Sequence, residues 1–340
     1  MVGLVGKRTA GGWVVEESVE MPADRSGGYF SSCFLVTKDG KQAFLKALDI
    51  EKFDVNDLLG YLEGFKYESD LALLCRDDKL NRVVQVIETG EIDRPEQPVK
   101  VLQKVPYLVF ELADGDIRDS IDVSTSVSNQ WRFFVLRQTT LALLQLHSRS
   151  IAHQDVKPSN VLKFGADRLK LGDLGRASMR GRPAPHDELS RPGALNYAPF
   201  EQRYDFQPSD WVERRLTADV FHLGCLAVFN FTNVCFPEFV MQRLAEPYRP
   251  ENWGAPYLEV MPHIQTAAIE ALNELEKDFP EAFRSELTQI VLDLCHPDPA
   301  LRARTGPKNK TQVGLLWLQR YVSRFDVLEK RAGIRGSTNA

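Results

Sequence analysis

The sequence predicts an α+β chain of two lobes, a small β-rich lobe followed by a larger α-helical lobe. Its 340 residues exceed what one hydrophobic core usually organises. Runs of β-branched and aromatic residues characterise the chain up to about residue 112, and apolar residues recur at helical spacing from residue 129. We expect an N-terminal extension, a first lobe, a second lobe and a flexible tail, at residues 1–12, 13–113, 114–330 and 331–340.

The first lobe is predicted to be mainly a sheet. Five segments have strand composition, at residues 13–19, 32–37, 42–48, 81–88 and 107–112. Asp39-Gly40 separates the second and third and is typical of a tight hairpin turn. Helical spacing at 56–74 predicts one or two helices. The stretch 89–106 contains three prolines and charged residues, so we expect a loop there.

The second lobe is predicted to be helical. Helical spacing indicates helices at residues 129–148, 218–231, 265–278, 284–295 and 312–330. The first is amphipathic and ends just before a polar stretch. The second is strongly apolar around Asp219, which is typical of a buried helix.

Composition narrows the possible partners. The chain has 42 basic and 47 acidic residues, and no basic stretch alternates with aromatic residues, so we expect no nucleic-acid partner. No window approaches ~18 uncharged apolar residues, so we expect neither a membrane partner nor a signal peptide. The five cysteines form no C-x-x-C pair, which favours reduced thiols and a cytoplasmic location.

One polar stretch has the composition of a catalytic loop. Asp155, Lys157 and Asn160 lie between two apolar runs, and Asp173 follows Asn160 by thirteen residues. Phosphoryl transfer needs a group that accepts the proton of the attacking hydroxyl, ligands for a metal ion, and a cation near the phosphates. These four residues supply each of these functions.

The stretch resembles the H-R-D-x-x-x-x-N loop and the D-F-G turn of eukaryotic-type (Hanks-type) serine/threonine protein kinases, although Gln154 replaces the arginine. The resemblance implies a protein-kinase-like bilobal fold, ATP as the nucleotide and a protein substrate. It implies that Asp155 accepts the substrate proton and that Lys157 offsets charge on the transferring phosphoryl group. Asn160 and Asp173 would hold Mg²⁺, or Mn²⁺ in its place.

The same resemblance assigns phosphate-binding residues in the first lobe. Lys46, in Phe-Leu-Lys-Ala, fills the place of the lysine in V-A-I-K, which contacts the α and β phosphates. Its partner acid would lie on the following helix, where Glu68 and Glu63 are candidates. We favour Glu68, because the leucines and the strand that follow it keep the family's usual distances.

A weaker match covers the glycine-rich loop and the hinge. Gly27, Gly28 and Phe30 lie where kinases carry G-x-G-x-x-G, but serines occupy the outer glycine positions. At the hinge, backbone groups of Glu111 and Ala113 would bond to adenine, with Phe110 at the back of the pocket. Asp116 or Asp114 would reach the ribose.

The end of the predicted activation segment also resembles the family. Tyr197 and Glu201 keep the spacing of G-T-x-x-Y-x-A-P-E, and Arg302 lies where the family places the arginine that pairs with this glutamate. Asp219 would brace the catalytic loop, with His222 as a packed helix residue. Ala194 stands where these kinases usually have threonine, which removes one hydroxyl.

The departures leave alternatives open. Gln154 cannot supply the charge that meets a phosphate on the activation segment, so we expect activity without that phosphorylation. A small-molecule phosphotransferase of the aminoglycoside kinase type shares H-x-D-x-x-x-x-N, although Lys157 and the segment from Tyr197 to Glu201 speak against it. A nucleotide-binding pseudokinase scaffold is the second alternative, and Ala194 with the weak glycine loop favours it.

Overall fold

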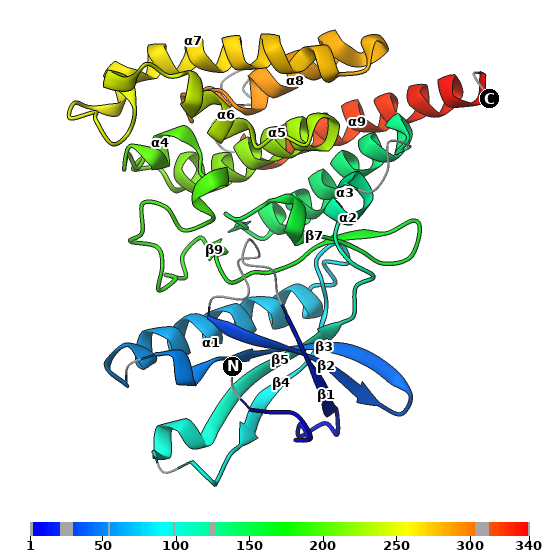
Figure 1. Cartoon of the computed structure of the whole chain (residues 1–340), viewed down its shortest axis with the longest axis vertical. Coiled ribbons are helices and arrows are strands. Elements are labelled where there is room, and N and C mark those ends of the chain that lie inside the picture. The colour runs from blue at the N-terminus through cyan, green and yellow to red at the C-terminus, as the bar shows by residue number, and fades with distance from the viewer. Residues whose placement is uncertain are drawn as a thin grey trace.

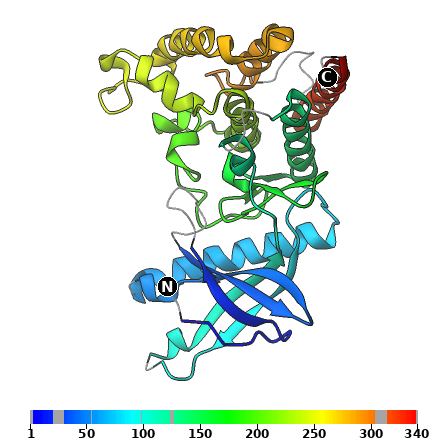
Figure 2. The same ribbon diagram turned by 45° about the vertical axis from the view of Figure 1, so that its right-hand side comes forward.

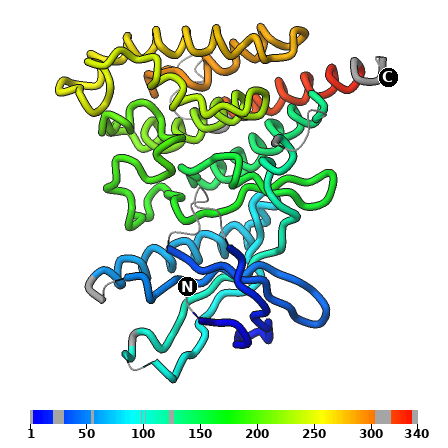
Figure 3. The backbone as a smooth tube through the Cα atoms, in the orientation of Figure 1, coloured from blue at the N-terminus to red at the C-terminus, as the bar shows by residue number. Residues whose placement is uncertain are grey.

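The molecule has a β-rich lobe and a helical lobe (Figure 1). The computed structural model describes residues 3–20, 30–53, 55–97, 99–122, 127–302 and 313–338. The tube representation shows the chain passing from the sheet into the helical lobe (Figure 3), and the last strand of the sheet ends at Glu111. The predicted α+β class and the order of the two lobes are confirmed.

The first lobe contains a five-stranded antiparallel sheet in the order β1-β2-β3-β5-β4. Its strands are β1 (Val14–Val19), β2 (Ser31–Lys38), β3 (Lys41–Leu48), β4 (Val86–Asp93) and β5 (Lys104–Glu111). Asp39 and Gly40 both have positive φ, 51° and 73°. Two successive positive φ values match the twist of a two-residue hairpin, so the predicted turn between β2 and β3 is confirmed.

The predicted loop at residues 89–106 is wrong. Strand β4 continues through Asp93, and β5 begins at Lys104, so only a short connection with a 3₁₀ turn joins them. The two strands pair along their length, and buried Ile92 and Val105 face each other in the register. Prolines and charges indicated a loop, but cross-strand pairing and burial outweigh that local preference.

Helix α1 (Val55–Asp77) crosses the lobe between the sheet and the helical part (Figure 1). It forms a single helix, longer at both ends than the predicted 56–74. Leu71 and Cys75 are fully buried and belong to the core shared with the sheet. Burial of this face fixes the helix and therefore sets the position of Glu68.

The helical lobe is built around α3, α5 and α9, with α9 lying along α3 (Figure 2). Its helices are α2 (Arg118–Asp122), α3 (Asn129–Ser148), α4 (Phe200–Arg203), α5 (Thr217–Thr232), α6 (Phe236–Arg243), α7 (Tyr257–Leu275), α8 (Arg284–Leu294) and α9 (Val313–Thr338). The predicted helix at 129–148 has the observed bounds of α3, where Ser128 caps the first turn.

Two predicted helix ends differ from the structure. Helix α7 begins at Tyr257 rather than residue 265 and includes Pro262 in its interior. Helix α9 extends to Thr338, so residues 331–338 are helical where we expected a flexible tail. Ala332 is buried against the core, and this packing continues the helix beyond its predicted end.

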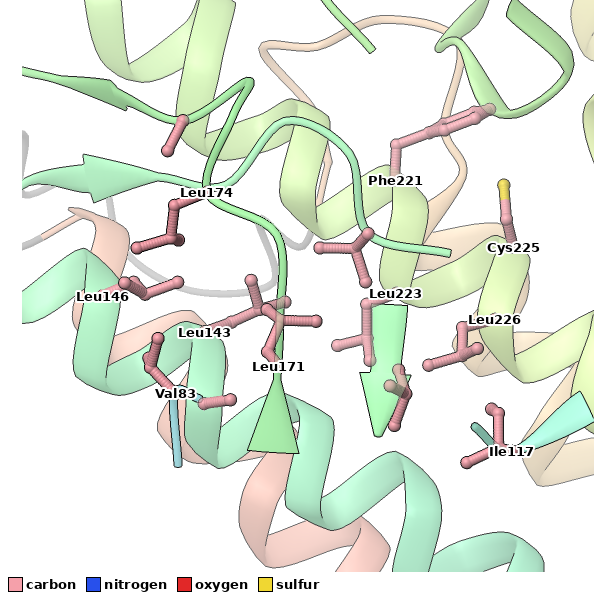
Figure 4. Packing of buried hydrophobic residues seen from close by; sticks show 14 of the residues in the cluster. Val83, Ile117, Leu143, Leu146, Leu171, Leu174, Phe221, Leu223, Cys225 and Leu226 are labelled. Carbon is pink, nitrogen blue, oxygen red and sulfur yellow. The ribbon is translucent and has the colours of Figure 1, made fainter. Parts of the chain in front are cut away.

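Short strands frame the polar stretch predicted to be catalytic. Strand β6 (Ile151–Ala152) pairs with β9 (Ser178–Met179), and β7 (Val161–Lys163) pairs with β8 (Leu169–Leu171). Leucines of α3, including Leu143 and Leu146, pack near Leu171 and Leu174 (Figure 4). The polar stretch and the turn at Asp173 thus pack against the same group of buried apolar side chains.

Within the described part of the chain, no single helix has the length and apolar composition to cross a membrane. One bent pair in that part of the chain passes the test jointly, Val212–Thr232 with Phe236–Arg243, and most of its residues are buried in the helical lobe.

Candidate active site

A buried cluster of three charged side chains joins the two lobes. Lys46 of β3 places its Nζ 2.7 Å from Glu68 Oε1 on α1 and 3.0 Å from Asp173 Oδ1 in the helical lobe. Lys46 and Glu68 are almost completely buried. The structure therefore pairs Lys46 with Glu68, the partner that we favoured over Glu63.

The two carboxylates determine the charge of Lys46. Burial by itself would lower the pKa of Lys46, but attraction to Asp173 and Glu68 outweighs burial and holds this pKa above its ordinary value. The ammonium therefore stays charged at neutral pH. It can attract nucleotide phosphates in a site that water screens only weakly.

The catalytic loop gathers its polar groups over a few ångströms. Lys157 Nζ lies 3.1 Å from Asp155 Oδ2, and both side chains are buried. Asn160 donates from Nδ2 to the backbone oxygen of Asp155 at 2.7 Å and to Asp155 Oδ2 at 3.2 Å. A 3₁₀ turn at Pro158–Asn160 brings Asn160 back toward Asp155. Base, lysine and amide thus form one rigid unit.

Asp219 of α5 anchors the backbone of this loop by hydrogen bonds. Its carboxylate accepts the backbone N–H groups of His153 and Gln154 at 2.8 and 2.7 Å, and His147 Nε2 lies 2.8 Å from it. Burial would raise the pKa of Asp219, but the hydrogen bond with His147 and the nearby histidines outweigh it, so this pKa is lowered. Gln154 has a φ of 63°, which this anchoring stabilises.

The donor set beside the loop fits a magnesium ion. Asn160 uses its amide nitrogen on Asp155, which leaves its side-chain oxygen as the atom for a metal. Asp173 lines the same cavity and has a φ of 60°, in the left-handed region. Carboxylate and amide oxygens are the ligands that Mg²⁺ takes beside phosphates. Among the described residues no group of three or more His, Cys, Asp or Glu suits a metal, so nucleotide oxygens would have to complete the shell.

An apolar cavity of about 240 Å³ lies between the lobes above these groups. Its walls come from the sheet, the hinge and β7–β8; they include Val19, Cys33, Phe44, Val83, Phe110, Leu162 and Leu171. Burial raises the pKa of the Cys33 thiol to about 11, so Cys33 contributes an apolar surface at neutral pH. An apolar cavity with charged side chains among its lining residues suits a nucleotide base and its phosphates.

Of the residues predicted at the hinge, Glu111 and Ala113 lie at the cavity as expected, whereas Asp116 does not. Glu111 and Ala113 line the cavity, but the carboxylate of Glu111 accepts from Gln85 N and pairs with Lys170. Asp116 does not line the cavity: it is fully buried and bonds to Arg118. The predicted contact of Asp116 with ribose is therefore wrong, because this carboxylate caps the start of α2.

Asp114 and Phe30 also differ from expectation. The side chain of Asp114 accepts from Gly165 N and lies outside the cavity lining. Gly27 and Gly28 lie outside the described residues. Phe30 is not among the residues lining the nucleotide cavity; it stacks on Tyr61 of α1 at 5.2 Å between ring centroids.

The activation segment comprises residues 173–201, and its last residue, Glu201, forms the ion pair that the spacing predicted. Arg302 donates from both terminal nitrogens to Glu201, and both side chains are almost fully buried. Ala194 lacks a hydroxyl, but its backbone N–H donates to Asp155 Oδ1 at 2.9 Å. This bond connects the segment to the candidate base even without the family's threonine.

Sequence reasoning missed three residues around the site. Ser159 lines the cavity. Arg215 donates to the side chain of Gln154, and Asp187 accepts from the same arginine. No spacing or motif relates residues 154, 187 and 215, so only the folded chain reveals this contact.

Comparisons with known proteins agree with this geometry. A family model described as "Protein kinase domain" matches residues 27–310. Mitogen-activated protein kinase 11 of Oryza sativa subsp. japonica is 32% identical over 124 residues, which are 36% of this chain and 21% of that protein. Mitogen-activated protein kinase 19 of Arabidopsis thaliana is 28% identical over 163 residues, 47% of this chain and 25% of that protein.

These matches span only a fifth to a quarter of the length of the curated relatives. The family match, in contrast, covers most of this chain and includes Lys46, the catalytic loop and Glu201. The chain therefore belongs to the protein kinase family.

Proposed function

We propose that the protein transfers the γ-phosphate of ATP to serine or threonine hydroxyls of protein substrates. One observation carries the proposal: Lys46, Glu68 and Asp173 form one charged cluster across the two lobes. In this arrangement the phosphate-binding lysine, its acid partner and a metal ligand occupy their working positions together. The base and lysine of the catalytic loop lie in the same helical lobe.

The reaction follows from these positions. The substrate oxygen attacks the γ-phosphorus, a new P–O bond forms, and the bond to the β–γ bridging oxygen breaks, releasing ADP. Asp155 accepts the hydroxyl proton, since its carboxylate is held by Lys157, Asn160 and Ala194 N. Lys157 offsets negative charge on the group in transfer.

ATP with Mg²⁺, or Mn²⁺ in its place, is the cofactor that the site supports best. The metal ion would neutralise phosphate charge, held by Asn160 and Asp173. Lys46 would hold the α and β phosphates. The apolar cavity would take adenine, with the hinge backbone at Glu111 and Ala113 as its hydrogen-bonding edge.

The preference for a protein hydroxyl rests on the second lobe. Lys157 is typical of kinases that act on serine and threonine, and its contact with Asp155 supports that role. The clamp between Glu201 and Arg302 anchors the segment on which protein kinases bind peptide substrates. The aminoglycoside kinase type gains no comparable support from the structure.

Activity is proposed to be independent of phosphorylation on the activation segment. Gln154 carries no charge and donates from Nε2 to the backbone oxygen of Arg176 at 2.8 Å. The Lys46–Glu68 pair and the contact of Ala194 with Asp155 are both formed in the unmodified chain. Treating the protein with phosphatase should leave its rate unchanged.

We also propose a cytoplasmic location, which the five cysteines support because none of them forms a disulfide. Subcellular fractionation of the native host tests this location, and recovery in an oxidising compartment would overturn it.

The decisive assay is radiolabel transfer from γ-³²P-ATP and Mg²⁺ by the purified chain. Casein and myelin basic protein are offered beside a panel of amino-sugars, with Asp155→Asn as the inactive control. We expect label on serine and threonine of the proteins, and none with the variant. Label on amino-sugars alone would favour the small-molecule phosphotransferase. If neither the wild type nor the variant transfers label to any acceptor while both still bind nucleotide, the pseudokinase scaffold is favoured.

A further inference from the structure

A buried arginine occupies the space between the catalytic loop and the activation segment. Arg215 lies in a π-helical turn, Val212–Leu216, immediately before α5, and it is 1% exposed. It donates from one terminal nitrogen to Gln154 Oε1 and from the other to the backbone oxygen of Asp187, both at 2.6 Å. The second nitrogen also lies 3.3 Å from Asp187 Oδ1.

The carboxylate of Asp187 organises the segment around itself. Its Oδ1 accepts from Ser178 Oγ at 2.8 Å, and its Oδ2 accepts from Ala184 N at 2.7 Å. Ser178 belongs to β9, which pairs with the strand that leads into the catalytic loop. One acidic side chain therefore joins two parts of the segment and the buried guanidinium.

Gln154 completes the connection on the other side. Its amide oxygen accepts from Arg215, and its amide nitrogen donates to Arg176 O. The backbone oxygen of Gln154 also lies close to Gly193, where an added Cβ would stand 2.3 Å from it. Arg215 is thus linked, through the side chain of Gln154, to Arg176 near the start of the activation segment, and the backbone of Gln154 packs closely against Gly193 near its end.

The charge balance favours a functional pairing. A buried guanidinium needs a counter-charge, and the neutral Gln154 cannot supply one. Asp187 is the carboxylate that lies within 4 Å of Arg215 among the described residues. Burial lowers the pKa of Arg215 to about 10, so the guanidinium keeps its charge at neutral pH.

We propose that Arg215 and Asp187 are positioning residues that lock the activation segment against the catalytic loop, with the carboxylate of Asp187 serving where other kinases use an added phosphate. The arginine comes from the turn before α5 instead of from position 154. The inference rests on the proposed function, because it concerns how Asp155 is held for transfer.

The lock also predicts the effect of modifying Ser178. Its hydroxyl is buried and donates directly to Asp187. A phosphate at that oxygen would place further negative charge against the carboxylate and would remove the donated hydrogen bond. Phosphorylation of Ser178 would therefore weaken the attachment of the activation segment to the catalytic loop rather than strengthen it.

The test uses the full chain with three variants. Arg215→Gln and Asp187→Asn each remove one charge of the pair. The double variant Gln154→Arg with Arg215→Gln moves the guanidinium from residue 215 to residue 154, on the other side of the same contact. Arg137→Gln, which removes an arginine paired with Glu329 between α3 and α9, is the matched control.

Two readouts separate positioning from a general loss of structure. We expect each single variant to lower kcat about tenfold while KM for ATP changes less than about twofold, because the nucleotide cluster lies elsewhere. Amide hydrogen exchange at residues 176–195 should rise about tenfold, with no change in α7 and α8. The double variant should recover most of both losses, and Arg137→Gln should change neither.

Unchanged kcat and unchanged exchange in both single variants would overturn the inference. The inference would also be overturned if the double variant folds but its kcat is no higher than that of Arg215→Gln alone. If the wild-type chain transfers no phosphate, the proposed function fails, but hydrogen exchange still tests the positioning role of Arg215 and Asp187. A rise in exchange confined to residues 176–195 supports that role. No change in exchange, or a rise spread uniformly over the chain, overturns it.

Discussion

The two ends of the nucleotide cavity use charged side chains in opposite ways. At the phosphate end, Lys46, Glu68 and Asp173 come from different elements and contact one another. Near the hinge end, the carboxylate of Glu111 bonds to Gln85, and that of Asp116, which lies outside the cavity, bonds to Arg118; neither partner lines the cavity.

The difference reflects what each end must do. Charge moves during transfer at the phosphate end, so only particular side chains in particular places can stabilise it. Adenine, in contrast, is recognised by backbone groups and apolar walls, so hinge side chains are free for structural roles. Side-chain chemistry therefore identifies the first end from sequence, whereas it misleads at the second.

Asp173→Asn should have the largest effect, because it removes both a metal ligand and a counter-charge of Lys46. We expect kcat to fall about 10³-fold, with a higher Mg²⁺ concentration needed for half-maximal rate. Initial rates across a Mg²⁺ titration measure both. Asp167→Asn, on the exposed turn between β7 and β8, is the matched control. A loss smaller than tenfold would show that Asp173 is not a ligand.

Lys46→Met tests the same end with a side chain of similar length. Loss of the cation leaves the carboxylates of Glu68 and Asp173 without their counter-charge, and we expect kcat/KM for ATP to fall about 10²-fold. Steady-state kinetics at several ATP concentrations provide the measurement. Lys163→Met, on β7, serves for comparison, and equal losses in the two variants would contradict the role of Lys46.

Asp116→Ala tests the hinge end and should affect stability more than nucleotide use. Arg118 loses its buried partner, so we expect the free energy of unfolding to fall by about 1 to 2 kcal/mol. KM for ATP should change less than about twofold, since Asp116 does not line the cavity. Urea unfolding and ATP kinetics give the two values. A large rise in KM with unchanged stability would restore the ribose contact.

The smallest effect is expected from pH. Because the pKa of Lys46 is raised in the folded protein, its ion pairs are fully formed below its ordinary pKa and weaken only as pH rises beyond it. ADP affinity should therefore stay constant from about pH 7.5 to 9.5, a range in which the terminal phosphate of ADP is already fully ionised. Calorimetric titration across this range checks it, and a fall in affinity centred near pH 8 would indicate a neutral lysine.

Much of the fold could be predicted from local patterns. The hairpin at Asp39-Gly40 and the bounds of α3 depend on turn chemistry and capping, which neighbouring residues determine. Strand β4 and the last turns of α9 were missed because distant partners stabilise them. Periodicity within a segment does not report contacts between segments that are far apart in the sequence.

The same distinction holds in the candidate site. Spacing made Asp155, Asn160 and Asp173 candidates, because the family resemblance records which residue types lie at fixed offsets. Spacing does not record the direction in which the Asp116 side chain points. It also cannot show that Arg215 meets Gln154, since their contact exists only after the helical lobe has folded.

Gly193 has a consequence for mutational tolerance. An added Cβ there would stand 2.3 Å from the backbone oxygen of Gln154 and 3.1 Å from Asp155 Oδ1. Even alanine would push the segment away from the candidate base, although glycine takes part in no chemical step. In a saturation screen scored by phosphate transfer, this position should be as intolerant as Asp155 itself, while the adjacent Ala194 should accept small residues.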